Sequence, residues 1–571
     1  MKRRIGIILC ILTLAACGLV LYLNRDPAGS AVLDSGITID SVSSVQRDSL
    51  YRLGKVWGFV KYRHPDIIAG ELDWDAALLQ VLPDLLQAEN AQAANAVLGQ
   101  WLQQYPFSVQ TDDTAATCLQ LQQERGAAEA DLDWISDRDA LGETVCAYLE
   151  DLSRTYIGDR PDGYAAFSAE TPGVDFSGEA AYLFDWSDAG VKLLALFRFW
   201  NAYAYYSPHV DITPTDWDQA LYEGIDEMLA AQTERAYLEA LGSLASKTGD
   251  AHVSILDANR YLYRYYGFRF LPCSFLVLDG QITVQYVPED ETVLRPGDIL
   301  TEVDGLTMAQ RVAELSAHFA VPEPDKFAKA LSIPLMSAAG ATAQVTVLRD
   351  GQTLSLTVDT RQQPFQPENP LSNGLIEDGK IGYIDPSALE EGDLEQLMAS
   401  FAETDGIIVD LRQYPSVFLP YLLGAYITPQ PTQFAVMTLP NPALPGSFYR
   451  MDNFYTGADG SGPAAYTGRV VLLMNEYSLS QSEFTIMALR QSPQAVVIGS
   501  PSAGADGNAV SISLPGGVQA YFTGMGVFTP EGGQTQRVGL TPDIPCEPTV
   551  EGLRDGRDEL METAIAHILQ P

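Results

Sequence analysis

Val470-Val-Leu-Leu-Met474, followed directly by Asn475-Glu-Tyr-Ser-Leu-Ser-Gln-Ser-Glu483, is the stretch that decides the fold of the C-terminal part of this chain. Its continuously apolar first part is typical of a strand that is buried on both faces of a parallel sheet. A helix is expected to start near Ser480, because apolar residues then recur at helical spacing, at Phe484, Met487, Ala488 and Leu489. A serine on such a turn lies beside unpaired helix amides, which can stabilise an oxyanion. The stretch therefore predicts an exposed nucleophile at Ser480.

The same turn also fits a purely structural role. Ser480 or Ser482 could be the N-cap of the helix, with Glu483 as the capping-box acid of Ser480. Taken alone, the stretch favours the cap, because helix caps far outnumber nucleophiles. The rest of the chain has to decide between the two interpretations.

Three more short apolar runs lie in the same region, at 380–384, 406–411 and 495–498, separated by helical stretches. This alternation predicts an α/β domain over residues 361–571 with a largely parallel sheet. Ligands of such domains bind beyond the carboxyl ends of the strands. Ser480 and the segment Arg412-Gln-Tyr-Pro415 both follow such ends.

The composition limits the possible functions. At 571 residues the chain is too long for one core. Its formal charge of −40 argues against a nucleic-acid partner, because phosphates would be repelled. The cysteines after the first 24 residues show no zinc-ligand spacing, and nothing implies a metal or cofactor. Cys118 and Cys146 could form a disulfide, or all four of these cysteines could be single thiols; the other two are Cys273 and Cys546.

The N-terminus predicts attachment to a membrane. Met1-Lys-Arg-Arg4 is basic, and residues 5–23 form an apolar run just long enough to span a bilayer. Leu14-Ala-Ala-Cys17 also resembles a bacterial lipobox, which would leave a lipid-modified Cys17. Residues 1–24 are therefore expected to be an uncleaved anchor or a lipoprotein signal, with the remainder outside the cytoplasm. Residues 25–48 are then predicted to be a polar tether.

Residues 49–262 show helical periodicity and an internal duplication. Trp57 and Trp74 recur as Trp200 and Trp217 at a constant offset of 143, within similar aromatic segments. Two helical hairpins of common origin explain the repeat. The second copy continues to His252, where the first copy has Val109, so this histidine is a candidate for function.

Two other histidines, His64 and His209, lie beside prolines at loop positions and are expected to be structural.

Residues 263–360 change to a strand pattern. Asp279-Gly280 and Asp350-Gly351 each separate two apolar runs, as in β-hairpins. With Leu294-Arg-Pro-Gly-Asp298, this region closely resembles a bacterial PDZ domain. The resemblance implies that the loop before the first strand would hold a peptide C-terminus, with the peptide added as a strand, through Gly267, Phe268, Arg269 and Phe270. The alternative is a PDZ-like domain that only packs internally.

In this order, the helical region, the PDZ-like module and the motifs of the last domain resemble the tail-specific, or C-terminal-processing, serine peptidases and the related tricorn core. The motifs are Asp410-Leu-Arg412, Ser480-Gln-Ser-Glu483, Gly499-Ser-Pro-Ser-Ala-Gly504 and Gly539-Leu-Thr-Pro-Asp-Ile544. The resemblance covers roughly residues 50–570. It implies a multidomain α+β protein: a helical region with a duplicated hairpin, a PDZ-like β domain and a C-terminal α/β core of the crotonase/ClpP-like type.

The resemblance also implies roles for single residues. Ser480 falls on the family nucleophile. The lysine that serves as base in the processing branch is replaced by Ala505, followed by Asp506. The tricorn branch uses a histidine in a segment similar to Asp250-Ala-His252, so His252 becomes the expected base.

The acid and the oxyanion donors depart from the family pattern. The position of the acid holds Gln536, which can orient an imidazole but cannot stabilise its charge. Asp250 and Asp506 are alternative orienting groups. The expected oxyanion donors are the backbone N–H groups of Gln481 and of Ser416, although the usual glycines near Ser416 are missing.

These assignments predict a membrane-anchored, extracytoplasmic serine endopeptidase that cleaves unfolded tails or peptides by a Ser-His mechanism. The alternative is a catalytically inactive scaffold of the same fold that binds peptide C-termini through its PDZ-like domain. Hydrolysis of non-peptide acyl substrates would use the same residues.

Overall fold

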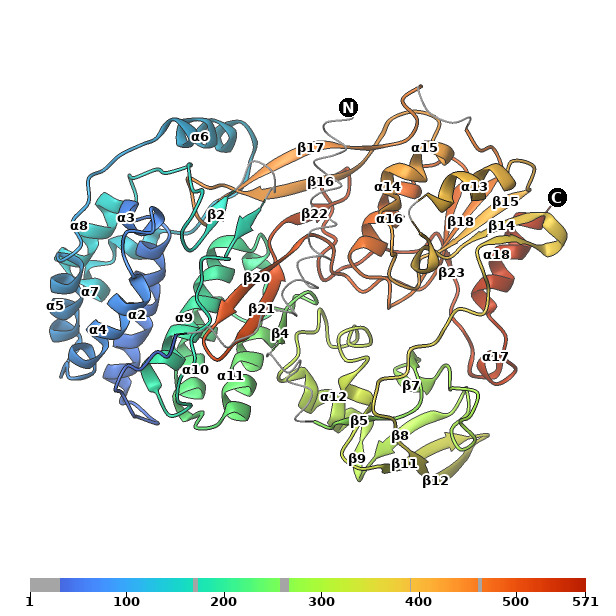
Figure 1. Ribbon diagram of the computed structural model, residues 1–571, viewed down its shortest axis with the longest axis horizontal. Helices are drawn as coiled ribbons and strands as arrows, with labels where there is room; N and C mark the ends of the chain where they lie inside the picture. Colours follow the sequence, from blue (N-terminus) through green and yellow to red (C-terminus); the bar gives the residue numbers. More distant parts are fainter. Residues whose placement is uncertain (1–30, 168–172, 257–265, 391, 461–464, 571) are drawn as a thin grey trace. The chain divides into compact units, whose positions relative to one another are not determined.

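The computed structural model describes residues 31–167, 173–256, 266–390, 392–460 and 465–570. The predicted anchor, Cys17 and the start of the predicted tether lie outside these ranges. Within them, no helix combines the length and the apolar character needed to cross a membrane. The chain divides into two compact units, and each takes several separate segments of the sequence (Figure 1). Unit 1 contains residues up to 262 with 437–451 and 508–526, and unit 2 contains 263–436, 452–507 and 527–571.

Unit 1 is mainly helical, and its two central hairpins repeat one arrangement. Helices α2 and α4 form the first copy, and α9 and α10 form the second (Figure 1). Their bounds are Ser44–Lys61, Trp74–Leu86, Ala189–Tyr206 and Trp217–Ala230. In the first copy each tryptophan indole N–H donates to the other tryptophan's carbonyl, at 3.0 Å in both directions between Trp57 and Trp74. Trp200 and Trp217 make the same reciprocal pair at 2.6 and 3.2 Å.

The first helices of the two copies cross through small residues. The Asn201 side chain of α9 donates to the Gly54 carbonyl of α2 at 3.0 Å. A Cβ atom added at Gly58 would lie 1.8 Å from Asn201 Oδ1, so only glycine permits this approach. Gly58 and Asn201 occupy equivalent positions of the repeat, so the copies meet about an approximate twofold axis.

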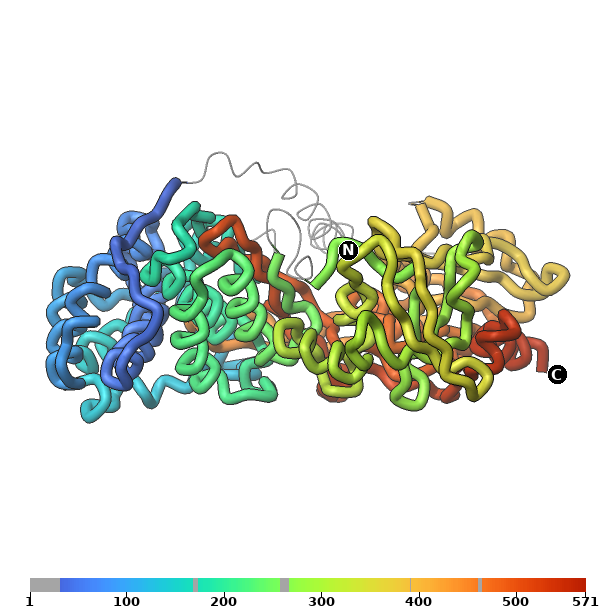
Figure 2. The backbone as a smooth tube through the Cα atoms, turned by 90° about the horizontal axis from the view of Figure 1, so that it is seen from below, coloured from blue at the N-terminus to red at the C-terminus, as the bar shows by residue number. Residues whose placement is uncertain are grey.

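The start of the described chain packs against unit 1. The Leu33 N–H donates to the Leu183 carbonyl at 2.8 Å, and the Ser35 N–H and hydroxyl both donate to Asp188, at 2.7 and 2.5 Å. Figure 2 shows this segment, in dark blue, running along the helices of unit 1. The prediction of a polar tether up to residue 48 is therefore wrong for residues 31–43, and α2 begins at Ser44.

The remaining elements of unit 1 complete its core. The hairpin β20 and β21 pairs with β4 in an antiparallel sheet, and their bounds are Ala509–Leu514, Val518–Thr523 and Ser254–Leu256. The other main helices are α5 (Ala91–Leu102), α6 (Asp113–Arg125), α8 (Glu143–Leu152) and α11 (Glu234–Ser246). Cys118 and Cys146, on α6 and α8, are buried free thiols, so they form no disulfide here.

Unit 2 begins with a small β domain. Its sheet has the order β12-β11-β8-β7-β6 with helix α12 beside it, and both predicted hairpins are confirmed. The turns Asp279-Gly280 and Asp350-Gly351 have positive φ at both residues, as a type I′ turn requires. The bounds are β6 Phe275–Leu278, β7 Gln281–Val284, β8 Ile299–Val303, β11 Thr342–Arg349, β12 Gln352–Asp359 and α12 Met308–Ser316.

The rest of unit 2 is an α/β domain with the sheet order β13-β14-β15-β18-β19-β23. The four predicted strands are confirmed and pair in parallel, and β13 is an antiparallel edge. Apolar residues of helix α18 form one buried cluster with alternate residues of the central strands. Figure 1 shows the helix beside these strands. The bounds are β13 Gly374–Ile376, β14 Ile381–Ile384, β15 Gly406–Asp410, β18 Arg469–Met474, β19 Ala495–Gly499, β23 Ile544–Pro545, α16 Gln481–Leu489 and α18 Glu559–Leu569. Strands β16 (Thr432–Pro440) and β17 (Phe448–Thr456) cross the boundary between the units.

Candidate active site

Ser480 occupies the turn between β18 and α16 in an unusual backbone conformation. Its φ and ψ are 55° and −115°, and its side chain is half-buried. Ser480 is the N-cap of α16 and forms the predicted capping box with Glu483, but its backbone angles differ from the extended ones that are usual at an N-cap. A non-glycine residue with positive φ costs about 1–3 kcal/mol, and such strain is typical of functional sites. The same sharp strand-to-helix turn exposes the nucleophilic serine of α/β-hydrolases.

The Glu483 carboxylate holds this turn in place by accepting several hydrogen bonds. Its carboxylate accepts the Ser480 N–H at 3.1 Å, which is the acidic half of the predicted capping box. It also accepts the N–H groups of Gly504 and Ala505, both at 3.0 Å, and the Ser502 hydroxyl at 2.5 Å. Burial raises the pKa of Glu483, and these four donors oppose that rise. The glutamate therefore ties the serine turn to the loop after β19.

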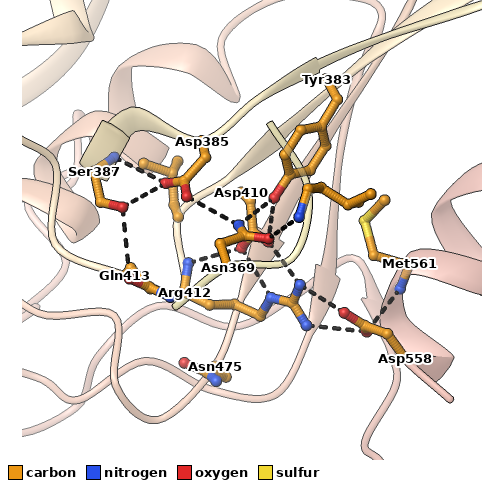
Figure 3. Close-up of polar contacts among 12 residues, drawn as sticks. Asn369, Tyr383, Asp385, Ser387, Asp410, Arg412, Gln413, Asn475, Asp558 and Met561 are labelled. Atoms are coloured by element: carbon orange, nitrogen blue, oxygen red, sulfur yellow. Dashed lines mark hydrogen bonds and ion pairs between the residues drawn. The ribbon is translucent and has the colours of Figure 1, made fainter. Parts of the chain in front are cut away.

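Arg412 anchors the neighbouring loop after β15. Its guanidinium binds the Asp410 carboxylate at 2.8 and 2.6 Å and the Asp558 carboxylate at 3.0 and 2.8 Å (Figure 3). Tyr383 donates to Asp410 at 3.0 Å. Burial alone would raise the pKa of Asp410, but Arg412 outweighs it and the pKa is lowered. The motif Asp410-Leu-Arg412 is thus an ion-pair support for the loop.

The predicted oxyanion donors in this region differ in their availability. The Ser416 N–H donates to the Pro386 carbonyl at 3.0 Å, and its hydroxyl donates to the Pro386 and Leu389 carbonyls. The structure therefore does not support Ser416 as an oxyanion donor. The Gln481 N–H is at the first position of α16, directly after Ser480.

The two candidate orienting residues of unit 2 are buried. Asp506 follows Ala505, and burial together with Glu483 raises the pKa of Asp506 well above its usual range. Its Oδ2 has no hydrogen-bond partner within the part of the chain that the structure describes. Gln536 is 1 % exposed and precedes Arg537, whose N–H donates to the Gly504 carbonyl at 2.6 Å.

His252 belongs to unit 1 and is held through a threonine. Its Nδ1 lies 2.9 Å from the Thr523 hydroxyl oxygen, and that hydroxyl donates to Asp250 Oδ1 at 2.9 Å. Because the hydroxyl proton points to Asp250, the Thr523 oxygen accepts from Nδ1–H, and the lone pair is left on Nε2. Burial lowers the pKa of His252, against an opposing effect of Asp250. The imidazole is thus set up as a neutral base.

His252 Nε2 is buried without a hydrogen-bond partner among the described residues, and 9 % of the side chain is exposed. Of the three candidate orienting residues, Asp250 is the one whose link to His252 the structure describes. Thr523 was not predicted, because it lies 271 residues away on β21 and no local pattern marks it.

The predicted peptide-binding loop is largely used by the protein itself. Arg269 and Phe270 form strand β5, which pairs with Ser337–Ala338. The Phe270 N–H also donates to the Arg361 carbonyl at 2.9 Å. A Cβ at Gly267 would lie 2.5 Å from the Ala338 carbonyl oxygen, which shows close packing there, and Phe268 is 65 % exposed. These contacts favour the alternative in which this β domain packs internally.

Part of the chain matches a known protein family, and its fold is similar to that of solved structures. Residues 380–546 match the family described as Peptidase family S41. Mature CPAF has a similar structure, with a TM-score of 0.52, 15 % identity and coverage of 66 % of this chain and 96 % of that one. Mature CPAF complexed with lactacystin gives 0.51, 14 %, 66 % and 98 %. A putative peptidase from Parabacteroides merdae gives 0.42, 16 %, 67 % and 97 %.

No curated protein is similar enough to this chain to count as a match. At the identities above, the two CPAF structures indicate a shared fold. With the match over residues 380–546, they support a peptidase domain of the serine type, similar to those of Peptidase family S41.

Proposed function

We propose that the protein is a serine-type endopeptidase that cleaves unfolded tails or peptides, with Ser480 as nucleophile and His252 as general base. The observation that carries the proposal is the strained conformation of Ser480 on the turn between β18 and α16. A nucleophile needs its hydroxyl presented at the end of the sheet, and the turn between β18 and α16 lies at such an end.

The reaction then follows the course of acyl transfer. The Ser480 oxygen attacks the scissile carbonyl carbon, and its proton passes to His252 Nε2. The Gln481 N–H stabilises the oxyanion of the tetrahedral intermediate. His252 returns the proton to the leaving amine, and water later hydrolyses the acyl-enzyme by the same route. The mechanism requires that Nε2 reaches the Ser480 hydroxyl during the reaction.

Asp250 and Thr523 take the place of the acid in this proposal. The carboxylate of Asp250 accepts from Thr523, and Thr523 accepts from the His252 ring. The relay holds the required tautomer, as the aspartate of a Ser-His-Asp triad does directly. The neutral Gln536 is then not needed as the orienting group.

The proposed location is outside the cytoplasm. The basic residues 1–4 and the apolar run 5–23 support a membrane anchor, either as a single helix or through lipidated Cys17.

The experiment that tests the function uses the full chain in detergent with unfolded casein and with peptides bearing free or amidated C-termini. Ser480→Ala and His252→Ala are both expected to abolish cleavage, as judged by mass spectrometry of the products. Ser482→Ala and His567→Ala are the matched controls and should retain it. Cleavage that survives Ser480→Ala would disprove the assignment.

The inactive scaffold is the competing outcome of the same experiment. A folded wild-type protein that cleaves none of the substrates would favour it. Binding of peptide C-termini through residues 267–270 receives no support from the structure, because the Phe270 N–H already donates to Arg361.

A further inference from the structure

Strand β6 is the last strand of the sheet in the small β domain, and one of its edges has no partner strand in the part of the chain that the structure describes. Two of its backbone groups instead bind the loop 475–480, which carries the proposed nucleophile. The Tyr477 hydroxyl donates to the Phe275 carbonyl at 2.5 Å, and the Val277 N–H donates to the Glu476 carboxylate at 3.3 Å. A peptide added to this edge as a strand would need such groups. The protein's own loop therefore occupies this part of the edge.

Little chain separates this contact from the nucleophile. The Tyr477 ring packs against both apolar clusters to which strand β6 contributes. Three residues further on, the Ser480 N–H donates to the Ala505 carbonyl at 2.8 Å. Between them, the Ser478 hydroxyl donates to the Leu411 carbonyl at 2.8 Å. The loop is thus held at short intervals, so a shift at Tyr477 is passed on to Ser480.

A second segment of the same domain, residues 322–326, holds Arg537. The Arg537 guanidinium donates to the Pro322 carbonyl at 3.0 Å and binds the Glu323 carboxylate at 2.6 Å. The Lys326 ammonium donates to the Arg537 carbonyl at 3.2 Å. Arg537 has a φ of 66°, which residues other than glycine seldom adopt, so its backbone conformation depends on contacts of this kind.

Arg537 connects this segment to the Ser480 turn through two further hydrogen bonds. Its N–H donates to the Gly504 carbonyl at 2.6 Å, and the Gly504 N–H donates to Glu483 at 3.0 Å. Glu483 is the carboxylate that also accepts the Ser480 N–H. A Cβ atom at Gly504 would lie 2.9 Å from the Arg537 carbonyl carbon, so the two backbones are in close contact. The β domain thus contacts the turn by two independent routes, one along the loop 475–480 and one through Arg537.

We propose that the β domain is a support of the nucleophile turn, and that Tyr477 and Arg537 are positioning residues for Ser480. This inference rests on the proposed peptidase function. A strained backbone conformation such as that of Ser480 persists only where the surrounding structure enforces it, and the two routes supply that restraint. Small displacements of a reacting group cost much of the rate, because attack requires a narrow range of geometry. Neither residue needs to touch the substrate.

Tyr477→Phe tests the first route, because it removes the hydroxyl and keeps the ring in its apolar site. We expect kcat for peptide cleavage to fall about tenfold with little change in KM. Labelling of Ser480 by a fluorophosphonate, followed by mass spectrometry, should slow by a similar factor. Ser337→Ala is the matched control. It removes a buried hydroxyl that donates within the β domain, to the Pro334 carbonyl at 2.7 Å, and should leave both rates unchanged.

Glu323→Ala tests the second route, because it takes the carboxylate partner from Arg537. The Glu323 side chain is 41 % exposed, so the ion pair is weak and kcat should fall only about threefold. Glu289→Ala removes an exposed carboxylate of the same domain and should have no effect. The melting temperature of each variant checks that the fold is retained.

Hydrogen exchange separates positioning from a general loss of stability. In Tyr477→Phe, exchange measured by mass spectrometry should become faster in the peptide that covers residues 475–489. In Ser337→Ala it should remain as in the wild type, even where the melting temperature falls by the same amount.

The outcomes separate the two proposals. Ser480-dependent cleavage that is unaffected by both Tyr477→Phe and Glu323→Ala would overturn this inference and leave the peptidase function standing. Equal losses of rate in Tyr477→Phe and Ser337→Ala would also overturn it, because the effect would then be one of overall stability. A folded wild-type protein with neither cleavage nor labelling would overturn both.

Discussion

The two copies of the duplicated hairpin carry the same ion pair in different surroundings. Lys55 of the first copy binds Asp218 of the second at 2.8 Å, and Arg198 of the second binds Asp75 of the first at 2.5 Å. The two cations occupy equivalent positions, as do the two carboxylates. However, the Asp218 side chain is 48 % exposed, whereas that of Asp75 is 1 % exposed. Duplication has preserved the pairing, but burial has changed what each pair contributes.

The buried pair has become part of a larger network. Lys61 and Glu179, whose side chains are fully buried, join the pair. Lys61 binds both Asp75 and Glu179, and Arg198 also binds Glu179, so that two cations face two carboxylates. The equivalent of Lys61 in the second copy is Ala204, which cannot extend the exposed pair in this way. The second copy instead continues to Asp250 and His252. The first copy therefore contributes to a buried network of ion pairs, and the second copy continues to a candidate catalytic histidine.

The largest expected effect is a difference in stability between the variants of the two equivalent aspartates. Asp75→Asn should lower the free energy of unfolding by about 3–5 kcal/mol, because it leaves buried cations without their partner. Asp218→Asn, with the same chemical change at the equivalent position, should cost less than about 1 kcal/mol. Urea unfolding of both variants measures the difference. Equal losses would show that burial does not decide the strength of this pair.

The same pair predicts a dependence on pH. Burial tends to raise the pKa of Asp75, but Arg198 and Lys61 outweigh it, so the pKa is lowered in the folded state. Stability from a lowered carboxyl pKa is present above the unfolded value near 4, and it is lost as the pH falls through the folded value. The difference in the free energy of unfolding between wild type and Asp75→Asn should therefore be at its full size at pH 7 and pH 5, and should decrease below about pH 4. Urea unfolding at these pH values measures it, and a gap that widens in acid would contradict the assignment.

A smaller effect is expected to be equal in the two copies. Trp57→Phe and Trp200→Phe each remove an indole N–H that donates to a buried carbonyl, at Trp74 and at Trp217, and each leaves a smaller ring in a buried site. Each should cost about 2 kcal/mol. Thermal unfolding that differs between the two variants by more than about 1 kcal/mol would show that the tryptophan pairs are not equivalent.

The smallest expected effect concerns the segment that follows the second copy and contains Asp250 and His252. Thr523→Val removes the hydroxyl between Asp250 and His252 and should lower kcat/KM about tenfold, which is close to 1.4 kcal/mol. The pKa on the acid side of the pH–rate profile should also move, because the imidazole loses its link to Asp250. Thr523→Ser should restore both. An unchanged profile would make Thr523 merely structural.

The local parts of the fold could be predicted from the sequence. The buried strands were recognisable as continuous apolar runs, and the hairpins were recognisable at Asp279-Gly280 and Asp350-Gly351, because a positive φ at both turn positions demands such residues. The tether prediction was wrong for residues 31–43, because polar side chains such as Ser35 bind a distant partner, Asp188, that composition cannot reveal.

The features of the candidate site also divide into those that local sequence could predict and those that it could not. The turn that carries Ser480 could be predicted, because a strand pattern is followed directly by a helix pattern. Thr523 could not, because it acts through a contact with His252, which lies far away in the sequence. The occupied Ser416 N–H could not be foreseen for the same reason, since its partner Pro386 comes from another loop.

The segmented build of unit 1 has a consequence for the timing of synthesis. His252 depends on Thr523, and 271 residues separate them. A ribosome that adds about 5–20 residues per second needs roughly 14–54 s to make that interval. During this time the histidine has been made but lacks its hydrogen-bond partner, while the strand and turn that carry Ser480 are produced before Thr523. A nascent chain therefore cannot fix the tautomer of His252 until Ser480 has already been made, so the proposed catalytic pair cannot be complete before Thr523 has been synthesised.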